Sequence, residues 1–138
     1  MELNLSFYGR PLVLTLSQKA LRELREQPSP LFVEMELCLK DFATKRVLCS
    51  AQPPVELEYQ WVLGNLAIAY RPLLARLAAP DVSVEAKINQ LEHKYPRWLW
   101  LDLDGQGYFG MFGLDKPEPA KSFKLPLLGP SKRRQIGL

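Results

Sequence analysis

The chain has 138 residues, of which 47% are hydrophobic and 24% are charged, a composition typical of one soluble globular domain. Its two cysteines exclude a disulfide-rich scaffold, and its longest apolar runs are too short for a helical membrane span. The formal net charge is +3, but residues 116–138 hold six basic groups against one acidic group, so residues 1–115 are mildly acidic. These observations predict one domain over 1–115 followed by a Pro-rich basic arm over 116–138.

The sequence at the amino end indicates in which cellular compartment we expect the protein. Glu2, Asn4 and Ser6 interrupt any apolar segment that could serve as a signal peptide. We therefore expect a cytoplasmic protein that makes no contact with a membrane.

The first half of the chain predicts two strand hairpins separated by a helix. Apolar and polar side chains alternate on either side of Gly9, as in paired strands. Ser17 is a suitable N-cap for the helix, Pro28 would end it, and alternation resumes after Pro30. The expected elements are strands at 3–8, 12–16, 31–40 and 45–50, and a helix at 18–27.

The second of these hairpins places the two cysteines. If Lys40 faces Lys45, then Cys38 faces Val47, and Cys49 lies on the same face as Cys38 but diagonal to it. Diagonal neighbours have Cβ atoms about 7 Å apart, whereas a disulfide needs about 4 Å. We therefore expect two reduced thiols.

The middle of the chain predicts a third hairpin and two further helices. Alternation points Val55, Leu57, Tyr59 and Trp61 inward, and the Gly64-Asn65 pair offers a two-residue turn. Proline at 72 suits the first turn of a helix, and apolar residues recur at helical spacing from 84 to 95. The expected elements are strands at 55–61 and 66–70 and helices at 73–79 and 83–95.

Residues 97–113, with the sequence RWLWLDLDGQGYFGMFG, predict a hairpin with two apolar faces. An Asp104-Gly105 pair between two alternating runs favours a tight turn, because glycine accepts positive φ. One face would be covered by the core, and the other needs a cover of its own: a helix such as 83–95, a protein partner, or nucleic acid. The first face carries Leu99, Leu101 and Tyr108, and the second, the hairpin face, carries Trp98, Trp100, Phe109 and Met111.

Motifs for catalysis and metal binding are sparse. The sequence DLDGQG at 102–107 matches the start of a calcium loop, but Gly113 stands where the final glutamate belongs, so we interpret it as a plain turn. His93 is the only histidine and lies off the apolar stripe of its predicted helix, which favours a solvated position. Phosphate-binding and dinucleotide-binding glycine motifs are both missing. We expect no catalytic residues, no metal and no cofactor.

The basic arm over 116–138 suggests nucleic-acid binding as an alternative function. Lys132, Arg133 and Arg134 could neutralise phosphates while rings of the hairpin face stack on bases, as in proteins that bind nucleic acid. An enzyme that uses Asp102 and Asp104 with a metal is a third possibility.

The sequence as a whole predicts an α+β domain with a largely antiparallel sheet of about six to eight strands, three short helices and an extended C-terminal arm. The leading functional hypothesis is a small binding or assembly protein without catalytic activity. It would contact protein, or another copy of itself, through the hairpin face and the arm. The alternative is a nucleic-acid-binding protein that uses the arm and the sheet aromatics.

Overall fold

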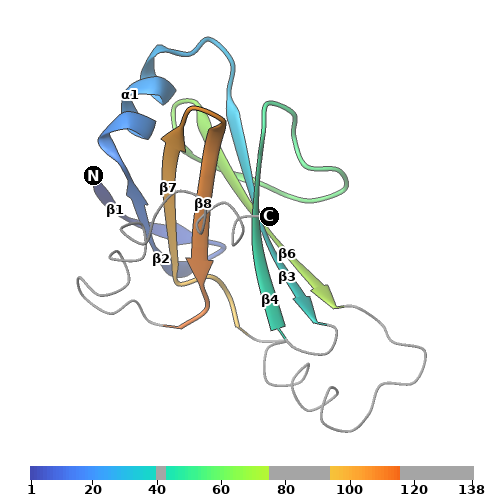
Figure 1. Cartoon of the computed structure of the whole chain (residues 1–138). Coiled ribbons are helices and arrows are strands. Elements are labelled where there is room, and N and C mark those ends of the chain that lie inside the picture. The colour runs from blue at the N-terminus through green and yellow to red at the C-terminus, as the bar shows by residue number, and fades with distance from the viewer. Residues whose placement is uncertain (40–42, 75–93, 116–138) are drawn as a thin grey trace, which may run out of the picture.

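The computed structural model describes residues 1–39, 43–74 and 94–115. Within these residues the chain forms one helix and eight strands, which make two four-stranded sheets (Figure 1). The helical structure in this part of the chain does not reach the length and apolarity needed to cross a membrane. The elements are β1 (Glu2–Phe7), β2 (Arg10–Leu16), α1 (Gln18–Glu26), β3 (Leu31–Leu39), β4 (Ala43–Ser50), β5 (Gln60–Leu63), β6 (Leu66–Leu74), β7 (Trp98–Asp104) and β8 (Gly107–Gly113).

The two sheets have matching strand orders. Sheet A is ordered β1-β2-β7-β8 and sheet B is ordered β4-β3-β6-β5. In each sheet two antiparallel hairpins meet at a parallel central pair, β2 with β7 in sheet A and β3 with β6 in sheet B. Each half of the chain, β1 to β4 and β5 to β8, therefore contributes one hairpin to each sheet.

The predicted α+β fold class is wrong. Both sheets are mixed rather than largely antiparallel, and the described residues hold one helix instead of the three expected. Hairpins join neighbouring segments and leave a local signal, whereas the central parallel pairs join strands that are far apart in the sequence. Sheet order was therefore not readable from the alternation alone.

The predicted helix at 73–79 begins inside a strand, because β6 continues through Pro72 to Leu74. Pro72 pairs with Leu37 of β3, while β5 pairs with β6 only as far as Ile68. The missing N–H of Pro72 therefore lies beyond the end of β5, where a strand tolerates proline. Tyr95 lies outside helix and strand, and the remainder of the predicted helices at 73–79 and 83–95 falls outside the described residues.

The predicted strand at 55–61 is also wrong over most of its length. Only β5 forms there, and Val55 and Trp61 are 76% and 51% exposed rather than turned inward. Alternation shows which residues share a face, but it does not show whether another sheet covers that face. The connection from β4 to β5 instead loops out beside sheet B (Figure 1).

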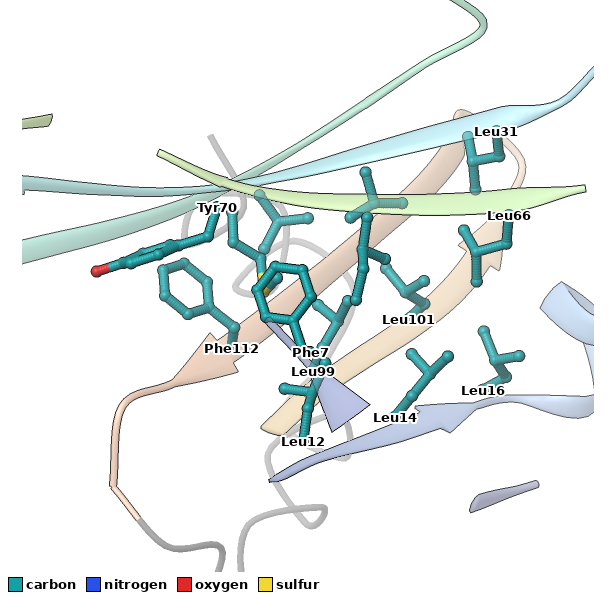
Figure 2. Close-up of a cluster of buried hydrophobic side chains, with 14 of the residues drawn as sticks. Phe7, Leu12, Leu14, Leu16, Leu31, Leu66, Tyr70, Leu99, Leu101 and Phe112 are labelled. Carbon is teal, nitrogen blue, oxygen red and sulfur yellow. The ribbon is translucent and has the colours of Figure 1, made fainter. Parts of the chain in front are cut away.

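The hydrophobic core lies between the two sheets (Figure 2). Alternate residues of the central strands point into it, and burial of each such leucine contributes about 1.5–3 kcal/mol. Beside the core, β4 lies against β8, and the Gln60 amide joins β5 to β1 by donating to the Ser6 carbonyl at 2.7 Å. The largest fully buried side chains are Phe7, Leu12, Leu14, Leu16, Val33, Met35, Leu37, Leu66, Ile68, Leu99 and Leu101.

The two predicted faces of the β7–β8 hairpin are confirmed, but its turn differs from the predicted one. Asp104 pairs with Gly107, so Gly105 and Gln106 form the turn, and Trp100 pairs with Met111. The predicted pairing is displaced by two residues, and an even displacement keeps every side chain on its face.

In the β3–β4 hairpin, the pairing differs from the predicted one by an odd number of residues, so the two cysteines do not share a face as predicted. Cys38 pairs with Thr44, while Cys49 pairs with Val33, a core residue. Cys38 therefore lies on the outer face of sheet B and Cys49 on the inner face, instead of sharing one face. Both thiols are free.

Candidate functional site

The hairpin face lies on the outside of sheet A. Trp100 and Phe109 are buried, with exposed fractions of 6% and 8%, and their rings meet edge to face at 5.6 Å. Trp98 and Met111 are half-buried, and the Trp98 indole lies over Gly113. The structure thus brings the four residues together, and their role as a binding surface stays a prediction.

Further candidate residues from the sequence lie outside the described part of the chain. These are His93 and the basic cluster Lys132, Arg133 and Arg134. Nucleic-acid binding through that cluster therefore also stays a prediction.

A second group of aromatic residues lies on the outer face of sheet B, where the sequence did not predict it. Trp61 of β5 and Phe32 of β3 both pair with Ala67 of β6, so the small alanine lies between two large rings. Their ring centroids are 5.4 Å apart, and Tyr59 lies 5.1 Å from Phe32 and 5.9 Å from Trp61. We call this group, with Leu48 and Val55, the aromatic face.

The aromatic face has a buried base and an exposed rim. Phe32 is only 7% exposed, because Tyr59 and Trp61 pack against it. Trp61, Tyr59, Leu48 and Val55 are 51%, 38%, 38% and 76% exposed. Large apolar side chains grouped on a surface in this way are typical of a protein-binding site.

Four charged side chains form two ion pairs next to the aromatic face. Arg71 Nε donates to Glu34 Oε2 at 2.8 Å, and Arg46 Nε donates to Glu36 Oε1 at 2.7 Å. Arg71 also donates to the Val55 carbonyl at 2.8 Å, which ties the β4–β5 connection to β6. The charges of the four side chains cancel.

The two carboxyl groups differ in their acidity. Burial raises the pKa of Glu36, and the neighbouring Glu34 carboxyl raises it further. Burial also acts to raise the pKa of Glu34, but hydrogen bonds from Glu36 and Arg71 outweigh it and leave this pKa below its ordinary value. Glu34 therefore holds its negative charge more firmly than Glu36 does.

The carboxylates near the turn of the β7–β8 hairpin accept hydrogen bonds from neighbouring backbone N–H groups. Asp104 Oδ1 accepts from the Gln106 N–H at 2.8 Å, and Asp102 Oδ1 accepts from the Leu103 N–H at 2.7 Å. Across 1–39, 43–74 and 94–115, no three His, Cys, Asp or Glu side chains gather as a metal site would require. A scan against protein-family models and searches of curated proteins and of solved structures found no match to this chain.

Proposed function

We propose that this protein is a small binding protein that assembles with a second copy of itself through the aromatic face. Trp61 carries the proposal, since its ring is half exposed while one side packs on Phe32 and Tyr59. Tryptophan and tyrosine held in this way lose little side-chain freedom on binding and supply much of the energy of protein interfaces.

Charge and strand geometry favour a second copy as the occupant. A two-fold interface places the same surface against itself, so any excess of one charge repels. Beside the aromatic rings, the ion pairs of Glu34 with Arg71 and of Glu36 with Arg46 neutralise four charges. The edge strand β5 is short, and its pairing with β6 is irregular between Trp61 and Leu63, which favours packing of side chains over addition of a strand.

The oligomeric state of the full chain tests the proposal. We expect a dimer by size-exclusion chromatography with light scattering, and Trp61→Ala should raise its dissociation constant about tenfold or more. The matched control is Trp98→Ala on the hairpin face, which should leave the dimer intact. Circular dichroism establishes that both variants are folded.

Two results would contradict the proposal. A wild-type chain that stays monomeric up to about 1 mM has no self-association of useful strength. If Trp98→Ala dissociates the dimer and Trp61→Ala does not, the hairpin face is the interface instead.

A further inference from the structure

A pocket of about 320 Å³ lies beside the β4–β5 connection. It is lined by residues from the β1–β2 turn, the β4–β5 connection, β6 and the segment before β7. We call it the tyrosine pocket, after Tyr8, Tyr70 and Tyr95; Glu56 and Glu58 contribute its acidic side chains.

The three tyrosine rings form a continuous wall. The Tyr95 centroid is 5.8 Å from that of Tyr70 and 6.5 Å from that of Tyr8, with interplanar angles of 53° and 68°. The face of a tyrosine ring is electron-rich and attracts a cation.

Tyr70 has a hydroxyl group that the fold does not use. Its side chain is 6% exposed, and within the described ranges its buried oxygen has no hydrogen-bond partner. Figure 2 shows the ring beside Phe112, with the hydroxyl directed away from the leucines of the core. A buried hydroxyl without a partner is costly, and a ligand that bonds to it removes the cost.

Two residues with a strained backbone conformation line the same pocket. Tyr8 and Glu56 each have a φ of 50°, and they are the non-glycine residues with positive φ in the described ranges. Such strain often accompanies binding sites, where it holds side chains in position. Both residues line the pocket.

Charged groups of both signs lie around the pocket, and Glu56 interacts with the Arg71 guanidinium. Glu56 and Glu58 contribute two carboxylates, while the Lys94 ammonium is 3.1 Å from Asp115 and pairs with it. The fold already contains a related contact, because the Arg10 guanidinium lies 4.3 Å from the centroid of the Tyr95 ring. Burial raises the pKa of Tyr70 to about 12, so its hydroxyl stays neutral and its oxygen remains an acceptor.

We propose that the tyrosine pocket binds a guanidinium group. The planar cation stacks on the tyrosine rings, and its N–H groups donate to the carboxylates of Glu56 and Glu58 and to the Tyr70 hydroxyl oxygen. The group belongs either to a free guanidino compound or to an arginine side chain of a peptide. The inference does not depend on self-assembly through the aromatic face.

Titration of the full chain, followed by amide chemical shifts, tests the proposal with methylguanidinium as the probe. We expect saturable shifts at Tyr8, Glu58 and Tyr95, and none with acetate. A capped Ala-Arg-Ala peptide separates the two sources, since peptide binding at least about tenfold tighter indicates an arginine side chain and equal binding indicates a free compound. Absence of saturable shifts at the pocket up to about 50 mM methylguanidinium overturns the proposal.

Matched variants establish which groups bind. Tyr70→Phe keeps the ring and should weaken binding about fivefold, whereas Tyr108→Phe, whose hydroxyl bonds to Gln27, should leave it unchanged. Glu58→Gln should weaken binding about tenfold, with Glu2→Gln as its control. Trp61→Ala should not alter it, which separates this site from the aromatic face. Wild-type affinity in both Tyr70→Phe and Glu58→Gln is the result that contradicts the site.

Discussion

Single residues owe their properties to the face on which they lie, and the cysteines show this directly. Cys38 lies on the outer face of sheet B, whereas Cys49 lies on the inner face and packs against the core. Burial raises the pKa of the Cys49 thiol to about 12, so almost none of it is thiolate at neutral pH.

This difference predicts one reactive thiol per native chain. With a chromogenic disulfide reagent at pH 8, Cys38 should react promptly and Cys49 only after denaturant is added. Cys38→Ser should abolish the native reaction, and Cys49→Ser should leave it. Equal rates for the two thiols would show that Cys49 is more accessible than its burial indicates.

A side chain at Gly110 would meet the backbone of β7. A Cβ there would lie 2.5 Å from the Trp100 carbonyl oxygen and 2.7 Å from Leu101 Cδ2. Because the first neighbour is backbone, Gly110→Ala should cost about 2–3 kcal/mol of unfolding free energy in urea. Gly64→Ala, which meets nothing within 4 Å, is the control. A loss no larger than that of Gly64→Ala would mean that the hairpin adjusts easily.

At the scale of elements, α1 depends on residues outside the helix for its carboxyl end. Ser17 Oγ caps the amino end by accepting from the Ala20 N–H at 3.1 Å. Asn65, in the β5–β6 turn, donates from Nδ2 to the carbonyls of Leu24 and Gln27 at 3.3 and 2.8 Å. The turn that joins β5 to β6 therefore also fixes the position of the helix.

Removing that link should loosen the helix end. Asn65→Ala should cost about 1–2 kcal/mol of unfolding free energy and speed hydrogen exchange in the last turn of α1. Asn4→Ala, on an exposed position of β1, should change neither measurement. Unchanged exchange in α1 would show that core contacts of Leu24 hold the helix by themselves.

The Arg71 side chain links β6 to β3 and to the β4–β5 connection. The stability that its ion pair with Glu34 contributes depends on pH. The pKa of Glu34 is lowered in the folded chain, so its contribution is present above its ordinary value of 4.5 and is lost as the pH falls through the folded value. The raised pKa of Glu36 acts in the opposite direction, which makes the Arg71 variant the cleaner probe.

Arg71→Met should cost about 1–2 kcal/mol at pH 7 and less at pH 3, measured by urea denaturation. Arg46→Met is the matched control and should cost less than about 1 kcal/mol, since the Arg46 side chain is 47% exposed against 26% for Arg71. An equal loss at both pH values would show that Arg71 acts by packing, and not through Glu34.

At the scale of the whole molecule, the fold buries acids that ionise only at high pH. Burial raises the pKa of Cys49, Tyr70 and Tyr108 to about 12, from ordinary values of 9.0, 10.0 and 10.0. These groups favour the folded state below about pH 9, and the advantage is lost as the pH rises toward 12, because the unfolded chain ionises first.

We therefore expect cooperative unfolding between about pH 9 and 12, followed by far-ultraviolet circular dichroism. Tyr70→Phe removes one of these acids and should shift the midpoint to higher pH. A midpoint that does not move would show that Tyr70 ionises without unfolding the chain.

Topology also belongs to the whole molecule. Because each half of the chain gives one hairpin to each sheet, neither sheet is complete without both halves. The central parallel pairs, β2 with β7 and β3 with β6, hold the halves together. Stability therefore depends on contacts between segments that are distant in the sequence.

The hairpins were the predictable part of the fold. Alternation and turn residues indicated the strands around Gly9, the Gly64-Asn65 turn and the two faces of 97–113, and the structure has all three. The same alternation misplaced Trp61, because it cannot tell a face covered by a sheet from one left open. The aromatic face was missed for that reason, since the predicted strand at 55–61 turned Tyr59 and Trp61 inward.

The sequence by itself determined which residues alternate, that turns lie near Gly9 and at Gly64-Asn65, and how α1 begins, since these depend on side chains a few positions apart. Only the tertiary structure decided which hairpins pair in parallel, which face of sheet B each cysteine occupies, and that Trp61 is exposed while Trp100 is covered. It also brought three tyrosines and two glutamates to one pocket. The reason is physical: burial and pairing between distant segments follow from how the two sheets meet, and local spacing carries no record of it.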